Sequence, residues 1–426
     1  MSKPSLPDST LEQVAGNGLL HRRIFLTHGA ALIGAGSLGL LAARPAASQE
    51  IPPWMRAPGL GMSAYGERSP FESDVTRGVA AVPGTTGTGA SRTPLESLQG
   101  TITPSALHFE RHHSGIPEID PDAHRLLIHG LVERPLVFSM DALHRYPMVS
   151  RIQFIECSGN SRPNLSATPP QGSCGDIHGM VSCSEWTGVP LSTLLDEAGV
   201  APNGRWILAE GTDAAAMSRS VPMAKALDDA LIALYQNGER LRPANGYPVR
   251  LFLPGYEGNI SVKWLRRLKV TAEPVMTKDE TSKYSDLLPS GQSLLFTYPM
   301  RVKSVITSPS PGLVLDGPGL YEISGLAWSA AGKIRAVDVS ADGGQTWAEA
   351  ALSEPVLSKS LTRFRMAWRR DGGPAVVISR AIDETGEVQP TRDEFLADKG
   401  AQVSYHNNAM QAWRIDADGA VTNVYI

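Results

Sequence analysis

The sequence Arg151-Ile-Gln-Phe-Ile-Glu-Cys157-Ser-Gly-Asn-Ser-Arg162 joins an apolar run to a cysteine, a Gly-Asn pair and an arginine. Branched and aromatic residues predict a strand over 151–157, and the Gly-Asn pair predicts a turn directly after it. Soft, high-valent metals prefer thiolate ligands, and nearby cations and backbone N–H groups lower the pKa of a thiol. Cys157 is therefore a candidate metal ligand, although a lone cysteine after a strand is more often a buried structural residue.

Two further cysteines, Cys174 and Cys183, bring the total to three. An odd count leaves at least one thiol without a partner in the chain, so a disulfide framework does not explain all three. Cys174 and Cys183 fit the buried structural role better than Cys157 does. No C-x-x-C-H motif occurs in the sequence, so we expect no haem in this chain.

The segment Phe109-Glu-Arg-His-His113 and the pair Lys283-Tyr284 carry further candidate groups. Arg111 and Arg162 could bind an oxyanion through the parallel donors of a guanidinium, although each alone is more often a surface ion pair. Adjacent histidines in a strand point to opposite faces, and no H-E-x-x-H pattern is present, so we do not expect a zinc site. A hydrogen bond from His113 to a cofactor is the preferred interpretation.

Arg250 and Lys263 lie in two neighbouring strand-like segments, 248–254 and 260–270. Two cations that converge with backbone amides could hold a terminal phosphate. From these residues alone, a solvated strand face explains the pair equally well.

The N-terminal region has the pattern of a twin-arginine export signal. Arg22 and Arg23 precede an apolar stretch over 29–43, and small residues follow at Ala46-Ala47-Ser48. The apolar stretch is shorter than the ~20 residues that a membrane-spanning helix needs. We therefore expect residues 1–48 to be a twin-arginine signal segment, with the periplasm as destination and no membrane span in the mature form. A basic patch beside a short anchor helix is the alternative. Because this route exports folded proteins, it suggests a cofactor inserted before export.

The rest of the 426-residue chain predicts an α+β fold in two domains. Residues 49–105 are rich in Pro, Gly, Ser and Thr and predict an extended arm that wraps the surface. Residues 106–290 mix strand patterns with short helices, one over 190–199 and one that starts at 220–222. Residues 300–426 show short, evenly spaced strand patterns, with Asp342-Gly-Gly as a tight hairpin, and predict a β-sandwich. The net charge is −4 with no long basic run, so nucleic acid is not an expected partner.

Several spaced motifs, taken in order, resemble the sulfite oxidase family of molybdopterin enzymes. They are R-x-H at 111–113, C-x-G-N-x-R at 157–162, P-x-R at 248–250 and S-V-K-W-L at 261–265, with further similarity over 185–191 and 228–254. The resemblance extends from about residue 105 to the C-terminus. The chain is still more similar to one branch, the SoxC-type sulfane dehydrogenases. Glu110–His113 with Asp120, Trp264–Leu268, Ser304–Gly312 and the twin-arginine leader carry that similarity.

The resemblance implies a fold, a cofactor and a set of site residues. The fold is a mixed α/β molybdopterin-binding domain followed by an immunoglobulin-like β-sandwich dimerisation domain. The cofactor is one molybdenum per chain, bound by the pterin dithiolene and by Cys157. Arg111, Arg162 and Tyr284 are implied to line the substrate pocket. The residues implied to hold the pterin and its phosphate are Phe109, Arg111, His112, His113, Asp213, Asn245, Arg250, Ser261, Val262 and Lys263.

This sequence departs from the family pattern in two places. Asn245 stands where the family often has a histidine, and asparagine cannot donate a cationic hydrogen bond. A pocket tryptophan of the animal enzymes falls near Gly175, inside an insert over 166–183. Such an insert could widen the mouth of the pocket for a substrate presented on a protein carrier.

The resemblance also implies an activity and partners. The activity is oxidation of a sulfur centre, either carrier-bound sulfane sulfur or sulfite, by oxygen-atom transfer in thiosulfate or sulfur oxidation. Electrons would pass to a SoxD-like cytochrome c subunit, and a SoxYZ-like carrier would present the substrate. The assembly would be a homodimer through the C-terminal domain or a two-plus-two heterotetramer. The alternatives are a free sulfite:cytochrome c dehydrogenase, a periplasmic methionine sulfoxide reductase and a non-catalytic scaffold subunit.

Overall fold

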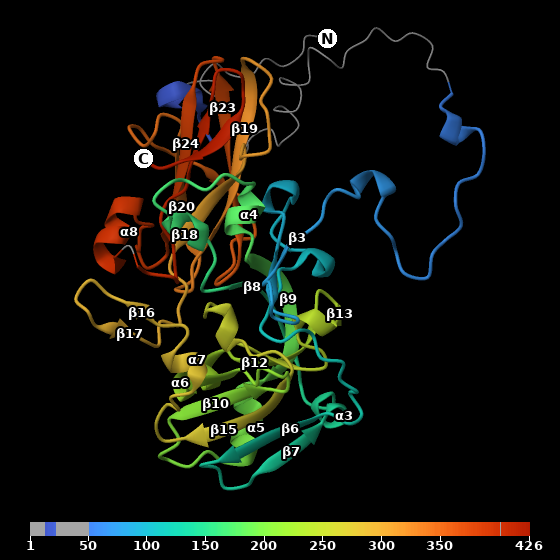
Figure 1. Cartoon of the computed structure of the whole chain (residues 1–426). Helices are drawn as coiled ribbons and strands as arrows, with labels where there is room; N and C mark the ends of the chain where they lie inside the picture. Colours follow the sequence, from blue (N-terminus) through green and yellow to red (C-terminus); the bar gives the residue numbers. More distant parts are fainter. Residues whose placement is uncertain (1–12, 23–50, 401) are drawn as a thin grey trace.

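The computed structural model describes residues 13–22, 51–400 and 402–426. Figure 1 shows two bodies, one with strands and short helices and one built almost entirely of strands. In the first body, a five-stranded sheet has the order β11-β10-β15-β6-β7. Its strands are β6 (Arg125–Gly130), β7 (Leu136–Ser139), β10 (Trp206–Gly211), β11 (Ser218–Pro222) and β15 (Leu265–Thr271). Only β15 and β6 are parallel, so the α+β prediction holds.

A second sheet of the first body carries the cysteine. Its order is β13-β12-β9-β8, and β14 pairs with β12. The strands are β8 (Val149–Glu156), β9 (Val181–Pro190), β12 (Leu231–Gln236), β13 (Glu239–Arg240) and β14 (Arg250–Phe252). The predicted strand before Cys157 is confirmed as β8.

Short helices cover these sheets. They are α3 (Met140–Leu143), α4 (Cys174–His178), α5 (Leu191–Ala198), α6 (Met223–Asp228) and α7 (Lys278–Thr281). The predicted helix over 190–199 is confirmed as α5, which buries Leu191, Leu194 and Leu195 on one face. Gly199 ends it with a φ of +68°, a conformation in which glycine avoids the steric cost of a side chain.

The C-terminal body consists of two antiparallel sheets packed face to face. One has the order β1-β2-β23-β19-β18, with β22 beside β23, and the other has the order β21-β20-β24-β25-β26. The shortest of these strands are β1 (Gln13–Ala15), β2 (Leu19–Leu20), β21 (Ala348–Glu349) and β22 (Ala351–Leu352). The main strands are β18 (Lys303–Ser308), β19 (Gly319–Trp328), β20 (Ile334–Ser340), β23 (Thr362–Arg370), β24 (Ala375–Asp383), β25 (Ala412–Ile415) and β26 (Val421–Val424). Phe364 and Ile323 of the first sheet share one core with Val377 and Trp413 of the second, so the predicted β-sandwich is confirmed. The helix α8 (Arg392–Lys399) packs beside it.

Three local predictions were wrong. Residues 220–222 complete β11, and the helix begins only at Met223 because Pro222 caps it instead of entering its first turn. The strand over 260–270 begins at Leu265, since Trp264 has a φ of +52° that no strand accommodates. Asp342-Gly-Gly lies in a longer loop between β20 and β21 (Ala348–Glu349) and not in a tight hairpin. The Asp342 carboxylate accepts backbone hydrogen bonds from the following residues and supports that loop.

The predicted arm over 49–105 divides into two parts. Residues 51–77 are mostly exposed and form a projecting loop in Figure 1, which contacts the first body where the Tyr65 hydroxyl donates to Glu239 at 2.7 Å. The second part forms a three-stranded sheet of β3 (Gly78–Ala81), β4 (Gly89–Arg92) and β5 (Arg111–His112). This sheet brings the R-x-H segment to the mouth of the site described below.

Part of the predicted signal segment is ordered against the C-terminal body. Residues 13–22 form β1 (Gln13–Ala15) and β2 (Leu19–Leu20), and Leu19 pairs with Trp368 of β23. Leu19 and Leu20 are buried, and the Trp368 indole donates to the carbonyl of Asn17 at 2.7 Å. The rest of the segment, with Arg23 and the apolar stretch, lies outside the described residues. Among the described residues, no helix is long and apolar enough to cross a membrane.

Candidate functional site

Cys157 lies directly after β8, at the start of a tight loop. Its backbone N–H donates to the Met180 carbonyl at 2.9 Å, and its carbonyl accepts from Asn160 N at 2.9 Å. Ser161 has a φ of +64°, so the chain turns back sharply before Arg162. The loop therefore presents the thiol and the arginine on the same side.

A buried polar network fixes this loop from below. Lys303 of the C-terminal body donates to Ser161 Oγ at 2.7 Å and lies 3.2 Å from Glu156 Oε1. The other oxygen of Glu156 accepts from the Trp328 indole at 2.7 Å. Asn160 Nδ2 also donates to Glu156, at 2.9 Å. Because these bonds cross between the two bodies, the sandwich helps to set the position of the Cys157 loop.

The expected low pKa of Cys157 is not found in the protein alone. Burial raises the pKa of the thiol to about 11, and the backbone hydrogen bond from Gly159 and the charge of Arg111 only partly oppose this shift. A bound metal deprotonates a coordinating thiol outright. Among the described residues, no three His, Cys, Asp or Glu side chains gather to hold a metal by themselves. A metal at Cys157 would therefore take its other ligands from a cofactor.

A cavity of about 570 Å³ opens in front of the Cys157 thiol. All three predicted catalytic residues, Arg111, Arg162 and Tyr284, line it together with His113. Four cations contribute to the lining, Arg92, Arg111, Arg162 and Lys283, and no carboxylate does. In the described part of the chain, the side chains of Arg92, Arg162 and Lys283 form no hydrogen bond or ion pair. Such a cavity attracts anions.

Tyr284 and His113 face each other across this cavity. The Tyr284 hydroxyl lies 3.0 Å from His113 Nε2. Burial, followed by the charges of Arg111 and Lys283, lowers the pKa of His113 to about 3, so the ring is neutral and its tautomer decides which of the two groups donates in this bond. Burial also raises the pKa of Tyr284, which therefore keeps its proton.

A second, narrower cavity runs from Cys157 toward the strands that carry the predicted phosphate ligands. Most of the predicted cofactor residues line it, namely Phe109, Arg111, His113, Asn245, Arg250, Ser261, Val262 and Lys263. Two predicted residues do not. His112 bonds Lys263 and Glu110 instead, and Asp213 accepts from Ser114 Oγ at 3.1 Å. His112, the last residue of β5, and His113, which follows the strand, thus have different partners.

Arg250 and Lys263 place two buried cations in the lining of this second cavity. Arg250 is 3% exposed and donates to the carbonyls of Asn245 and Ser261, while its Nε has no partner among the described residues. Lys263 Nζ donates to the carbonyls of Arg111 and Ala244, both at 3.1 Å. Burial lowers the pKa of Arg250 to about 9 and lowers that of Lys263 as well. No carboxylate of the described residues pairs with either cation, so the site fits a group that brings its own negative charge, as a pterin phosphate does.

Asn245, at the place of the family histidine, makes two hydrogen bonds within the chain. Its side-chain amide donates to Gln236 Oε1 at 2.8 Å, away from Arg250, and only its backbone carbonyl bonds the guanidinium. Gly175 is buried in α4 and does not line the substrate cavity, to which the insert over 166–183 contributes Ser166 and Met180.

Several lining residues were not among the predicted site residues. Arg92 and Tyr405 line the substrate cavity, and His108, Met217 and Asn259 line the narrower one. Arg92 was overlooked because it lies in the stretch interpreted as a surface arm. Tyr405 comes from the C-terminal body, more than 240 positions after Cys157, and no local pattern marks it.

Glu110, next to the site, predicts an acid dependence of stability. Burial alone would raise its pKa, but hydrogen bonds from His112 and Arg77 outweigh burial and lower it to about 2. An ionised carboxylate stabilised in this way contributes about 3 kcal/mol above pH ~4.5, and the contribution is lost as pH falls toward ~2. Glu110→Gln should therefore lower the free energy of unfolding at pH 7, and its effect should shrink between pH 5 and 2. Urea unfolding across this range measures it. Glu118→Gln, at an exposed position, is the control and should show no such trend.

Comparison with known proteins identifies both bodies. Residues 113–278 match the oxidoreductase molybdopterin binding domain, and residues 295–412 match the Mo-co oxidoreductase dimerisation domain. The chain is 31% identical to chicken (Gallus gallus) sulfite oxidase over 323 residues, which are 70% of each protein. It is 32% identical to the mitochondrial sulfite oxidase of Mus musculus, covering 70% of this chain and 59% of that protein. The chain thus spans less than two thirds of the length of some of these relatives.

A solved structure is similar over most of the chain. The sulfane dehydrogenase SoxCD from Paracoccus pantotrophus matches with a TM-score of 0.85 and 46% sequence identity, over 88% of this chain and 98% of that chain. The two domain matches follow each other in the order expected for a molybdopterin domain and a dimerisation domain. The two domain matches and the 31% identity over 70% of the chicken enzyme show that this chain belongs to the sulfite oxidase family of molybdopterin oxidoreductases.

Proposed function

We propose that this chain oxidises an anionic sulfur centre, with carrier-bound sulfane sulfur as its preferred substrate and free sulfite as the alternative. The observation that carries the proposal is the cavity beside Cys157, which is lined by four cations and by no carboxylate. Sulfite, thiosulfonate and sulfane groups are anions, and a cavity of this charge raises their local concentration. Similarity to a chain named sulfane dehydrogenase supports the choice of sulfane sulfur.

The residues of the cavity divide the work in this proposal. Arg111 and Arg162 bind the oxygen atoms of the substrate and neutralise its charge near the thiol. In the tautomer protonated at Nε2, neutral His113 donates to the Tyr284 hydroxyl oxygen, which leaves the hydroxyl proton free to donate a hydrogen bond to the substrate. Arg250 and Lys263 hold the phosphate of the pterin at the inner end of the second cavity. The bound molybdenum cofactor supplies oxygen-atom transfer and accepts two electrons.

Partners and location belong to the same proposal. The chain contains no C-x-x-C-H motif, so a separate cytochrome c subunit takes the electrons, and a SoxYZ-like carrier presents the sulfur. A homodimer or a two-plus-two assembly forms through the C-terminal domain, which the match to a dimerisation domain supports. The arginine pair and the apolar stretch after it support export of the folded protein to the periplasm by the twin-arginine route.

A comparison of kcat/KM for two substrates tests the proposal. The molybdenum-loaded full chain is assayed with a cytochrome c acceptor on free sulfite and on a carrier protein whose cysteine bears a sulfane sulfur. We expect kcat/KM for the carrier to exceed that for sulfite by roughly 10-fold or more, a difference of ~1.4 kcal/mol in transition-state binding. Equal values would remove the preference for sulfane sulfur. Reduction of methionine sulfoxide with no oxidation of either sulfur substrate would contradict the proposal as a whole.

A further inference from the structure

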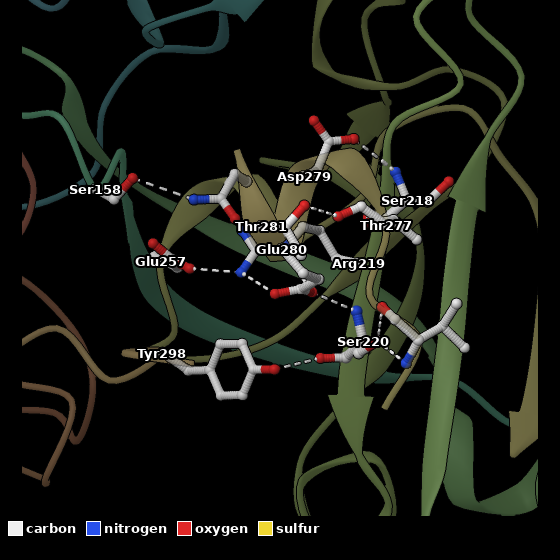
Figure 2. Close-up of polar contacts among 12 residues, drawn as sticks. Ser158, Ser218, Arg219, Ser220, Glu257, Thr277, Asp279, Glu280, Thr281 and Tyr298 are labelled. Atoms are coloured by element: carbon white, nitrogen blue, oxygen red, sulfur yellow. Dashed lines mark hydrogen bonds and ion pairs between the residues drawn. The ribbon is translucent and has the colours of Figure 1, made fainter. Parts of the chain in front are cut away.

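A buried charged cluster lies directly behind the substrate cavity and has no part in the functions assigned so far. Its centre is Arg219 of β11, whose side chain is fully buried. Arg219 Nε donates to Glu280 Oε1 at 2.9 Å, and one terminal nitrogen donates to Glu257 Oε1 at 2.9 Å. Figure 2 shows the guanidinium between these two carboxylates. Burying three charges is costly unless their geometry is well satisfied, so the cluster calls for an explanation.

One face of the Arg219 guanidinium supports Tyr284. The Cζ atom of Arg219 lies 4.8 Å from the centre of the Tyr284 ring. The remaining terminal nitrogen of Arg219 has no hydrogen-bond partner among the described residues. Tyr284 has a φ of +55°, a left-handed conformation that is strained for a residue with a side chain. Such a conformation persists only where the surroundings impose it, and Arg219 acts on it from the ring side.

Glu280 acts on the same turn through the backbone. It lies in α7, which ends at Thr281, shortly before Tyr284. Its Oε1 accepts from Ser220 N at 2.7 Å in addition to Arg219 Nε. The Arg219 side chain and the Ser220 backbone N–H, both in β11, therefore hold α7 against the sheet. Tyr284 follows the end of α7 by only a few residues.

Glu257 connects the cluster to the other wall of the cavity. Its Oε2 lies 3.2 Å from His406 Nε2, and the backbone N–H of His406 donates to the Ser158 carbonyl at 2.8 Å. Asn259 Nδ2 donates to Ser158 Oγ at 3.1 Å. Ser158, which Figure 2 shows at the end of one of these hydrogen bonds, follows Cys157 directly, so these bonds tie the cluster to the cysteine loop.

We propose that Arg219 is a positioning residue for Tyr284. Bridged between Glu280 and Glu257, it holds the left-handed turn that aims the Tyr284 hydroxyl at His113, and it sets Tyr284 relative to the Cys157 loop. This inference rests on the proposed function, because it assigns Arg219 a task in the substrate cavity. Arg219 does not line that cavity and acts only through Tyr284.

A double-mutant cycle between Arg219→Lys and Tyr284→Phe tests the proposal in the molybdenum-loaded full chain. Lysine keeps a charge between the carboxylates but loses the fork that reaches both of them and the flat face beneath the ring. We expect Arg219→Lys alone to lower kcat/KM by about 10- to 100-fold. In the Tyr284→Phe background its effect should be less than about twofold, because the hydroxyl it positions is gone. Equal losses in both backgrounds, or no loss in the first, would overturn the proposal.

Two further proteins separate positioning from stability. Glu280→Gln keeps the shape of the cluster and should show the same dependence on Tyr284, which provides a second cycle if Arg219→Lys folds poorly. Arg370→Lys is the matched control, since Arg370 is equally buried but bonds carbonyls of Gly317 and Asp416 in the C-terminal body. It should lower the melting temperature without changing kcat/KM.

Sulfate affinity, measured by calorimetry on the same proteins, gives a readout that does not depend on turnover. Arg219→Lys should weaken sulfate binding in the Tyr284 protein and not in the Tyr284→Phe protein. If the wild-type chain binds sulfate but oxidises no sulfur compound, the proposed function fails. The effect of Arg219→Lys on sulfate binding, with and without the Tyr284 hydroxyl, then still decides the role of Arg219. A wild-type chain that neither binds sulfate nor oxidises sulfur would overturn both.

Discussion

Replacing Cys157 by serine is expected to lower turnover by on the order of 10³-fold, about 4 kcal/mol of barrier. Cys157 is the only cysteine that lines either cavity of the site, and a hydroxyl is a much poorer ligand than a thiolate for a soft metal. The fold should survive, because serine has nearly the same shape and the backbone bond to Met180 is unchanged. Steady-state kinetics, with molybdenum per chain measured by mass spectrometry, gives the result.

Cys183→Ser is the matched control for this substitution. Cys183 is fully buried in β9, its sulfur lies 3.3 Å from Ser360 Oγ, and it lines neither cavity. The control should keep wild-type turnover while its melting temperature changes. A Cys157→Ser protein with wild-type turnover would remove Cys157 from the site.

Arg250→Met is expected to have the second largest effect, and the effect should depend on the cofactor. In the cofactor-free chain, Arg250 is a buried cation without a carboxylate partner, so its removal relieves a desolvation cost that offsets the hydrogen bonds lost. In the loaded protein the same change also removes the charge-assisted bond to phosphate that we propose for Arg250. The loss of unfolding free energy should therefore be about 3 kcal/mol larger for loaded than for cofactor-free protein.

Thermal unfolding of both forms, with cofactor content per chain, measures this difference. Lys225→Met is the control, because Lys225 is also buried but already pairs with Asp229 within the chain. Its cost should be the same with and without cofactor. An equal cost for Arg250→Met in the two forms would mean that Arg250 does not contact the phosphate.

The sequence predicted the elements whose signal is local. The strand before Cys157 was predicted from its branched and aromatic residues, and the helix α5 from apolar residues that fall on one face. Predictions were wrong where tertiary contacts select an unusual backbone, as at Trp264, whose positive φ coincides with an indole bond to the Pro243 carbonyl. The site residues came mostly from spaced motifs that resemble one family, and periodicity alone could not have placed Arg250 beside Lys263.

Contacts between distant segments were not predictable from local patterns. The Arg219 cluster joins β11, α7 and the loop that contains Glu257. In the sequence, nothing distinguishes each of these charged residues from a charged residue on the surface. The pairing of Leu19 with Trp368 was missed for another reason, because the segment was interpreted only as an export signal. Both features depend on which surfaces the fold brings together.

Molybdenum X-ray absorption tests the central claim most directly, because it counts the sulfur atoms bound to the metal. Wild-type and Cys157→Ser proteins are loaded with cofactor to the same molybdenum content and compared. We expect the spectrum of Cys157→Ser to show one Mo–S contact fewer than wild type, with a lighter atom in its place. The same sulfur count in both proteins would show that Cys157 is not a ligand of the metal and would contradict the account of this site.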